Sequence, residues 1–165
     1  MFGRAKELAR QETVTGAIEE ISAEFLKRAA FDAHSYGWTD DLAEHLAATA
    51  LKPFVEFVLG GKDAEEAYRE AMDYGHFQMF EEMYTSAMAE GRSRRDAFMM
   101  LLLLDRELAE NRGEPEVKFP RAWVDAGAAA LEAAAERGAP LSEQIGAGFD
   151  VFGKAAKSAM PNAAA

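Results

Sequence analysis

Four side chains that could bind a soft metal fall on one face of a predicted helix. They are Met72, His76, Met79 and Met83, and their spacing by four, three and four residues places them on one side of an α-helix. Thioether sulfur and imidazole nitrogen are ligands that suit Cu(I) or a haem iron. The pattern predicts either a site for a soft metal, a haem or a small apolar ligand, or a helix whose methionines fill a core as flexible apolar side chains.

A second candidate site lies at the start of the helix expected after Gly91. It consists of Arg92, Ser93, Arg94 and Arg95, with Ser93 as the helix cap. Arginines at a helix N-terminus oppose the helix dipole, and a bound phosphate or a partner's carboxylate would offset that conflict. The alternative is surface ion pairing with Glu90 or Asp96, which contributes little to stability.

Most catalytic chemistry is excluded by missing residues and motifs. The chain has no cysteine, so thiolate metal sites, disulfides and cysteine nucleophiles are ruled out. The nucleophile elbow, the zinc-peptidase motif and the phosphate-binding loop of nucleotide hydrolases are absent, as is the Glu-x-x-His pair of di-metal helical bundles. We therefore expect a protein that is not an enzyme and whose sequence requires no cofactor.

The elements that must position these residues are helices. Alanine occurs 34 times, whereas valine, isoleucine and threonine together occur 14 times, which favours helix over strand. Helical spacing and capping residues predict six or seven helices in one compact all-α domain over residues 1–160, with an apolar central helix around 95–110. The count depends on whether Pro53 and Gly75 interrupt their helices. Residues 161–165 are expected to form a frayed tail.

The net charge of the chain restricts the partners that it is expected to bind. The formal net charge of −11 argues against binding of nucleic acid. An acidic mimic of nucleic acid is a further interpretation, against which the 18 interspersed basic residues argue.

The longest apolar run, from Ala97 to Leu104, is too short to span a membrane. Without a secretory signal at the N-terminus, we expect a cytoplasmic protein.

Apolar surface in excess of what six or seven helices can cover points to association with protein. The segments Phe54–Leu59 and Phe98–Leu104 are densely apolar. Three large aromatic residues lie beside predicted loops, where interfaces often use them: Trp38, Phe119 and Trp123. The sequence thus predicts a homo-oligomer, or a protein that binds another protein in a regulatory, adaptor or chaperone-like role.

Overall fold

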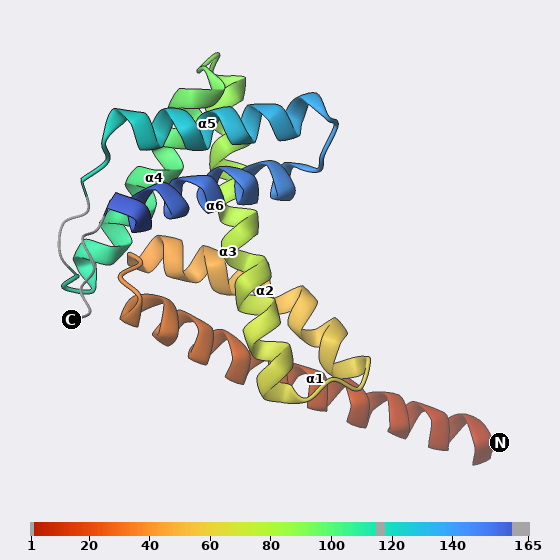
Figure 1. Cartoon of the computed structure of the whole chain (residues 1–165). Coiled ribbons are helices and arrows are strands. Elements are labelled where there is room, and N and C mark those ends of the chain that lie inside the picture. Colours follow the sequence, from red (N-terminus) through yellow and green to blue (C-terminus); the bar gives the residue numbers. More distant parts are fainter. Residues whose placement is uncertain (1, 115–117, 160–165) are drawn as a thin grey trace. The chain divides into compact units, whose positions relative to one another are not determined.

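Six α-helices form the described part of the chain, in which there is no strand. The structure is a computed structural model that describes residues 2–114 and 118–159, with side chains from Thr13 onward. The helices are α1 (Phe2–Ser35), α2 (Asp40–Leu59), α3 (Ala64–Ala89), α4 (Arg94–Asn111), α5 (Arg121–Glu136) and α6 (Leu141–Ala159). The predicted all-α fold is confirmed, with six helices (Figure 1).

The helices divide into two compact units that share α3. Unit 1 runs to His76 and unit 2 begins at Phe77. The single domain over residues 1–160 stays a prediction, and the predicted frayed tail at 161–165 lies outside the described residues. In the ranges that the structure covers, no helix combines the length and the hydropathy needed to cross a lipid bilayer.

Unit 1 is built on the pairing of α1 with α2. The turn between them contains Gly37, whose φ of 91° is the left-handed conformation that commonly ends a helix. Apolar side chains spaced by four and three residues form one stripe along α1: Val14, Ile18, Ile21, Phe25, Ala29 and Ala33. The C-terminal half of this stripe, from Phe25 onward, is buried. The N-terminal half of α1 extends past the turn that joins α2 to α3 (Figure 1). Consequently Val14 and Ile21, on the same stripe, remain 49% and 37% exposed.

Helix α3 approaches α2 closely at Gly75. A Cβ atom at this position would lie 2.8 Å from Cδ1 of Leu46 and 3.1 Å from Cβ of Ala50, so the crossing favours glycine. The sequence leaves open whether Gly75 and Pro53 interrupt their helices. The structure places Gly75 inside a continuous α3 and Pro53 inside a continuous α2.

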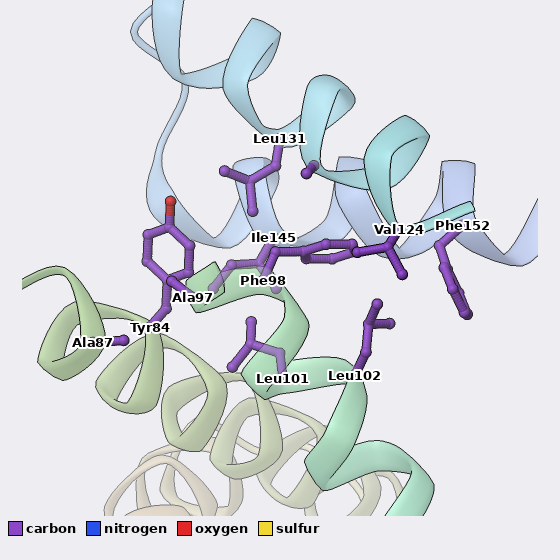
Figure 2. Close-up of a cluster of buried hydrophobic side chains, with 11 residues drawn as sticks. Tyr84, Ala87, Ala97, Phe98, Leu101, Leu102, Val124, Leu131, Ile145 and Phe152 are labelled. Carbon is purple, nitrogen blue, oxygen red and sulfur yellow. The ribbon is translucent and has the colours of Figure 1, made fainter. Parts of the chain in front are cut away.

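The core of unit 2 is organised around Phe98 of α4, which is fully buried (Figure 2). Its ring lies against two glycines, Gly127 of α5 and Gly148 of α6, where a Cβ atom would approach a ring carbon to 2.6 and 2.8 Å. The core also contains Leu101 and Leu102, so the predicted apolar helix around residues 95–110 supplies the central side chains of this unit. Leu103, between buried neighbours, is 40% exposed.

Candidate functional site

The four residues of the predicted soft-metal site all lie on α3, where a metal or ligand site stays a prediction. Met72 and Met79 are buried, whereas His76 and Met83 are partly buried. Met72 and His76 belong to unit 1, and Met79 and Met83 to unit 2, where Met83 packs against the hydrophobic core. Among the described residues, no group of three or more histidine, aspartate and glutamate side chains is arranged to hold a metal ion.

The imidazole of His76 is held by two contacts inside unit 1. Its Nδ1 donates a hydrogen bond to the backbone carbonyl of Met72 at 2.8 Å. Its ring lies edge-on to Trp38, with the ring centroids 5.4 Å apart. These contacts give His76 a structural role beside a core tryptophan.

The arginines of the second candidate site face carboxylates of this chain. Arg94 Nη1 lies 3.5 Å from Glu132 Oε1, and Arg95 Nε lies 2.6 Å from Asp125 Oδ1, so both arginines connect α4 to α5. Arg92 Nε pairs with Glu90 Oε2 at 3.2 Å. Each of these arginines therefore has a carboxylate of the same chain beside it. That carboxylate supplies the negative charge that a bound anion would otherwise bring.

Ser93 is the N-cap of α4, as its spacing from Asp96 predicts. Its Oγ accepts a hydrogen bond from the backbone N–H of Asp96 at 3.1 Å and donates one to Asp96 Oδ2 at 2.8 Å. Both hydrogen bonds of this cap are therefore made to residues of the same chain.

The three aromatic residues predicted at an interface differ in exposure. Trp38 is only 3% exposed and belongs to the core of unit 1, so it offers no surface to a partner in this structure. Phe119 and Trp123 are partly buried in unit 2 and flank Phe152, with centroid distances of 5.5 and 6.2 Å. An interface at Phe119 and Trp123 stays a prediction.

An open apolar groove lies in unit 1 where α1, α2 and the start of α3 meet. Its larger part has a volume of about 230 Å³. Apolar and aromatic side chains make up most of its lining, together with three charged ones: Ile21, Phe25, Phe54, Val58, Ala64, Tyr68, Glu24, Arg28 and Glu65. A smaller apolar depression continues it between α1 and α2, and the two share Ile21 and Val58. The groove therefore follows the exposed side of the α1–α2 pair.

The groove combines an aromatic floor with an incompletely buried helix end. Phe25 stacks on Phe54 with the ring centroids 4.4 Å apart, and it meets the edge of Tyr68 at 5.5 Å. Of the apolar segment Phe54–Leu59, Phe54 is buried, while Leu59 is 65% exposed. The segment that the sequence marks as excess apolar surface is thus only partly covered by its own chain.

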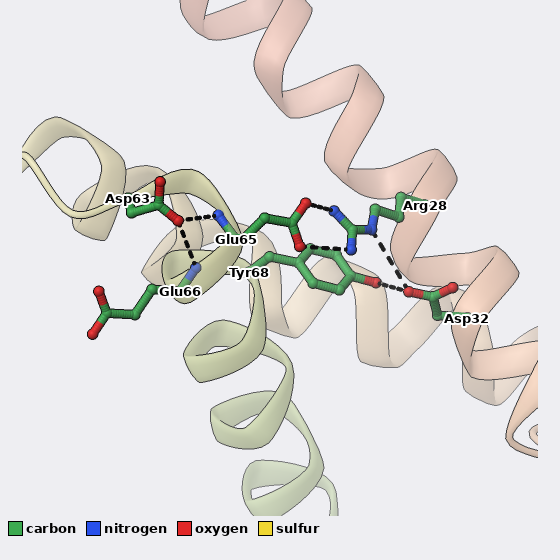
Figure 3. Close-up of polar contacts among 6 residues, drawn as sticks. All are labelled: Arg28, Asp32, Asp63, Glu65, Glu66 and Tyr68. Carbon is green, nitrogen blue, oxygen red and sulfur yellow. Dashed lines mark hydrogen bonds and ion pairs between the residues drawn. The ribbon is translucent and has the colours of Figure 1, made fainter.

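A polar network joins α1 to α3 at one edge of the groove (Figure 3). The Arg28 guanidinium donates two hydrogen bonds to the Glu65 carboxylate, at 2.6 and 3.0 Å, and lies 3.9 Å from the centre of the Tyr68 ring. Tyr68 Oη donates to Asp32 Oδ2 at 2.6 Å. Asp63 Oδ1 accepts hydrogen bonds from the backbone N–H groups of Glu65 and Glu66 and so caps the N-terminus of α3. The network fixes the first turn of α3 against α1.

The network shifts the pKa values of its members. The hydrogen bonds between Arg28 and Glu65 lower the pKa of the Glu65 carboxyl and raise that of the Arg28 guanidinium. Burial is the main cause that raises the pKa of the Tyr68 hydroxyl, and its hydrogen bond to Asp32 acts in the same direction. Arg28 and Glu65 are therefore charged, and Tyr68 neutral, near pH 7.

Sequence reasoning identified parts of the groove but not the groove itself. The stripe on α1 and the segment Phe54–Leu59 are visible in the sequence, but nothing there shows that they meet. Arg28 and Glu65 are 37 residues apart. The only local signal was the four-residue spacing of Arg28 and Asp32, which is typical of an ion pair on a helix.

Comparison of the chain with protein-family models, with curated proteins and with solved structures finds no match.

Proposed function

We propose that this protein acts through association with another polypeptide chain rather than by catalysis, and that the groove of unit 1 receives a helix of the partner. The observation that carries the proposal is the continuity of apolar side chains from the buried part of α1 onto its exposed part. Phe25 is 2% exposed, and Ile21, one turn away, is 37% exposed. Leu59 of α2 borders the same groove with Ile21.

The size and the lining of the groove favour an inserted side chain over a free small molecule. Its volume of about 230 Å³ lies below the range of about 300–1,000 Å³ in which small-molecule pockets fall. Apolar side chains that project from one face of a docked helix would fill a groove of this kind. This is the sort of contact that a regulatory, adaptor or chaperone-like protein makes.

Self-association is part of the proposal, because a second copy is one possible source of such a helix. A groove that pairs with the same groove on a second copy would give a closed dimer with two-fold symmetry. Sedimentation velocity over a range of protein concentrations measures this directly.

The decisive experiment compares two double variants that each remove two exposed apolar side chains. Ile21→Ser with Leu59→Ser alters the groove, whereas Leu26→Ser with Phe31→Ser alters exposed positions on α1 outside the groove lining. Binding of a fluorescein-labelled amphipathic helix of leucine and glutamine is measured by anisotropy, and self-association by sedimentation.

We expect the native chain to bind the peptide or to self-associate, the groove variant to lose that association by about tenfold or more, and the control variant to keep it. Loss of association in both variants, or in neither, would overturn the assignment to the groove. A native chain that neither binds the peptide nor self-associates would overturn the function itself.

A further inference from the structure

We infer that the helix received by the groove is α1 of a second copy of this chain, in an antiparallel pair about a two-fold axis. The inference rests on the proposed function and adds the identity of the partner. It comes from the exposed half of α1, which carries the apolar pattern that a groove of this kind would bind. Each copy would then supply both a groove and a helix.

The exposed half of α1 has apolar side chains at the spacing of a docked helix. Val14, Ile18 and Ile21 stand at positions i, i+4 and i+7 and so lie on one face. Val14 and Ile21 are exposed, and Ile18 is partly buried. Helix α1 has 34 residues and its neighbour α2 has 20, so α1 is longer by 14 residues, or about 21 Å at 1.5 Å per residue. The chain thus presents an amphipathic helix that is not covered by its own unit.

An antiparallel pair brings the stripe of one copy onto the stripe of the other. With the two-fold axis between Ile18 and Ile21, Ile18 faces Ile21 of the second copy, and Val14 lies over its Phe25. Ile18, Ile21 and Phe25 all line the groove, so the docked helix would lie along it. The uncovered part of the stripe would thereby meet apolar side chains along its length.

The acidic side chains near the axis do not oppose this pairing, because they lie off the stripe. At about 100° per residue, Glu19 and Glu20 are about 160° and 100° away from Ile21 around the helix. The residues that flank the stripe at its centre are Ala17 and Ser22, which are small and uncharged. Two copies of α1 can therefore approach closely without bringing these glutamates together.

The charges of the groove lining are also compatible with a second copy. Arg28 and Glu65 are hydrogen-bonded to one another. In this register Glu24 lies about nine residues, or about 14 Å along the helix axis, from Glu24 of the second copy. This separation exceeds the Debye length of about 8 Å at physiological salt, so salt screens the repulsion between the two carboxylates.

The size of this contact is that of a reversible dimer. The groove lining together with Val14 and Ala17 comes to about 14 residues of each copy, whereas a standard interface of about 1,600 Å² has about 20–30 residues a side. In proportion, the pair would bury about 900 Å² in total, which lies in the range of weak interfaces below about 1,200 Å². We therefore expect a dimer that dissociates on dilution.

The test uses the intact chain, whose lack of cysteine allows single cysteines to report which faces meet. Ala17→Cys places a thiol beside the stripe, about 40° from Ile21 around the helix, and Ala23→Cys places one on the far side, about 160° away. Both alanines are exposed and lie within a few residues of the axis, so the two variants are matched. A short bis-maleimide is added at several protein concentrations, and covalent dimers are measured on denaturing gels.

We expect at least about fivefold more covalent dimer from Ala17→Cys than from Ala23→Cys, because only the former thiol faces the second copy in the antiparallel pair. Adding Ile21→Ser with Leu59→Ser to Ala17→Cys should remove this excess, whereas adding Leu26→Ser with Phe31→Ser should leave it. Sedimentation velocity of the native chain should show a dimer that forms as the protein concentration rises.

Equal crosslinking of the two cysteine variants, or more from Ala23→Cys, would overturn the inference, since the stripe would not be the contact between copies. A native chain that binds the leucine–glutamine peptide but stays monomeric would also overturn it. That result would leave the proposed function intact, with a different polypeptide as the partner. A native chain that neither binds the peptide nor self-associates would overturn both.

Discussion

Phe98 shows at the residue scale how one side chain can determine which neighbours are allowed. Its ring lies between two glycines on different helices, and α5 and α6 approach so closely there that a Cβ at Gly127 would also lie 2.9 Å from the carbonyl oxygen of Gly148. In a densely packed core, an added methyl group has no free space to occupy. Gly127 and Gly148 are therefore favoured by packing rather than by turn geometry.

We predict that Gly127→Ala lowers the free energy of unfolding by about 1–3 kcal/mol, because the new methyl group overlaps the Phe98 ring and the Gly148 backbone. The control is Gly146→Ala on α6, where an added Cβ meets nothing within 4 Å. Alanine there should be neutral or should stabilise by up to about 1 kcal/mol, since it restricts the unfolded chain and favours helix. Urea unfolding measures both, and equal effects would contradict the packing argument.

His76 provides a second residue-scale prediction, which separates the structural role from metal binding. His76→Ala removes the hydrogen bond to the Met72 carbonyl and the edge contact with Trp38, and should cost about 1–2 kcal/mol of unfolding free energy. His34→Ala, at a side chain that is 45% exposed, is the control and should cost less. Native mass spectrometry of both proteins shows whether copper is bound. If the native chain retains copper, the His76 variant loses it and the stability of the variant is unchanged, the metal site is favoured over the structural role.

Residue types allowed the caps to be predicted but not the close approaches. Ser93 caps α4 and Gly37 adopts the left-handed conformation, as local chemistry requires. The sequence leaves open whether Gly75 breaks its helix, because the effect of a glycine inside a helical pattern depends on its neighbours in space. Contact with Leu46 and Ala50, on another helix, explains this glycine, and that contact is not encoded near it in the chain.

At the scale of elements, the link between Arg28 and Glu65 attaches the first turn of α3 to α1. Both side chains are substantially exposed, so solvent and salt weaken their attraction. The two parallel hydrogen bonds and the contact of Arg28 with the Tyr68 ring nevertheless give this pair a defined geometry. We expect it to contribute to the angle at which α3 leaves the α2–α3 turn.

The pH dependence of unit 1 should reflect this pair. The pKa of Glu65 is lowered in the folded chain from its ordinary value of 4.5, so its stabilising contribution is fully present above that value and is lost as the pH falls through the lower folded-state pKa. Glu65→Gln should therefore lose less stability between pH 7 and pH 3 than the native chain, as measured by urea unfolding midpoints. Glu66→Gln is the control, because the Glu66 carboxylate points away from Arg28 in Figure 3. A Glu65 variant with the same pH dependence as the native chain would contradict this role.

The elements themselves could be predicted well from local pattern. The sequence predicts a helix over about residues 121–136, and α5 has those bounds, with Pro120 before it and the left-handed Gly138 after it. The groove could not be predicted, since it depends on how α1, α2 and the start of α3 pack against one another. Helix ends and helix pairing are set by tertiary contacts that no short window of sequence contains.

At the scale of the whole molecule, the excess apolar surface predicted from the sequence is concentrated in the described part of unit 1. In unit 2, most side chains of the segment Phe98–Leu104 are buried in the core or pack against it, whereas Leu103 is 40% exposed. In unit 1, the stripe on α1 and the end of α2 retain exposed apolar side chains beside a groove. This difference is why we assign association to unit 1.

Hydrogen–deuterium exchange of the intact chain, with and without the leucine–glutamine peptide, tests that assignment most directly. Amides in an exposed helix with few buried contacts open readily, so residues 13–24 should exchange quickly in the free chain. The account predicts that the peptide slows exchange in residues 13–25 and 54–59 and leaves α5 and α6 unchanged. Protection confined to unit 2, or none under conditions where the peptide is bound, would contradict it.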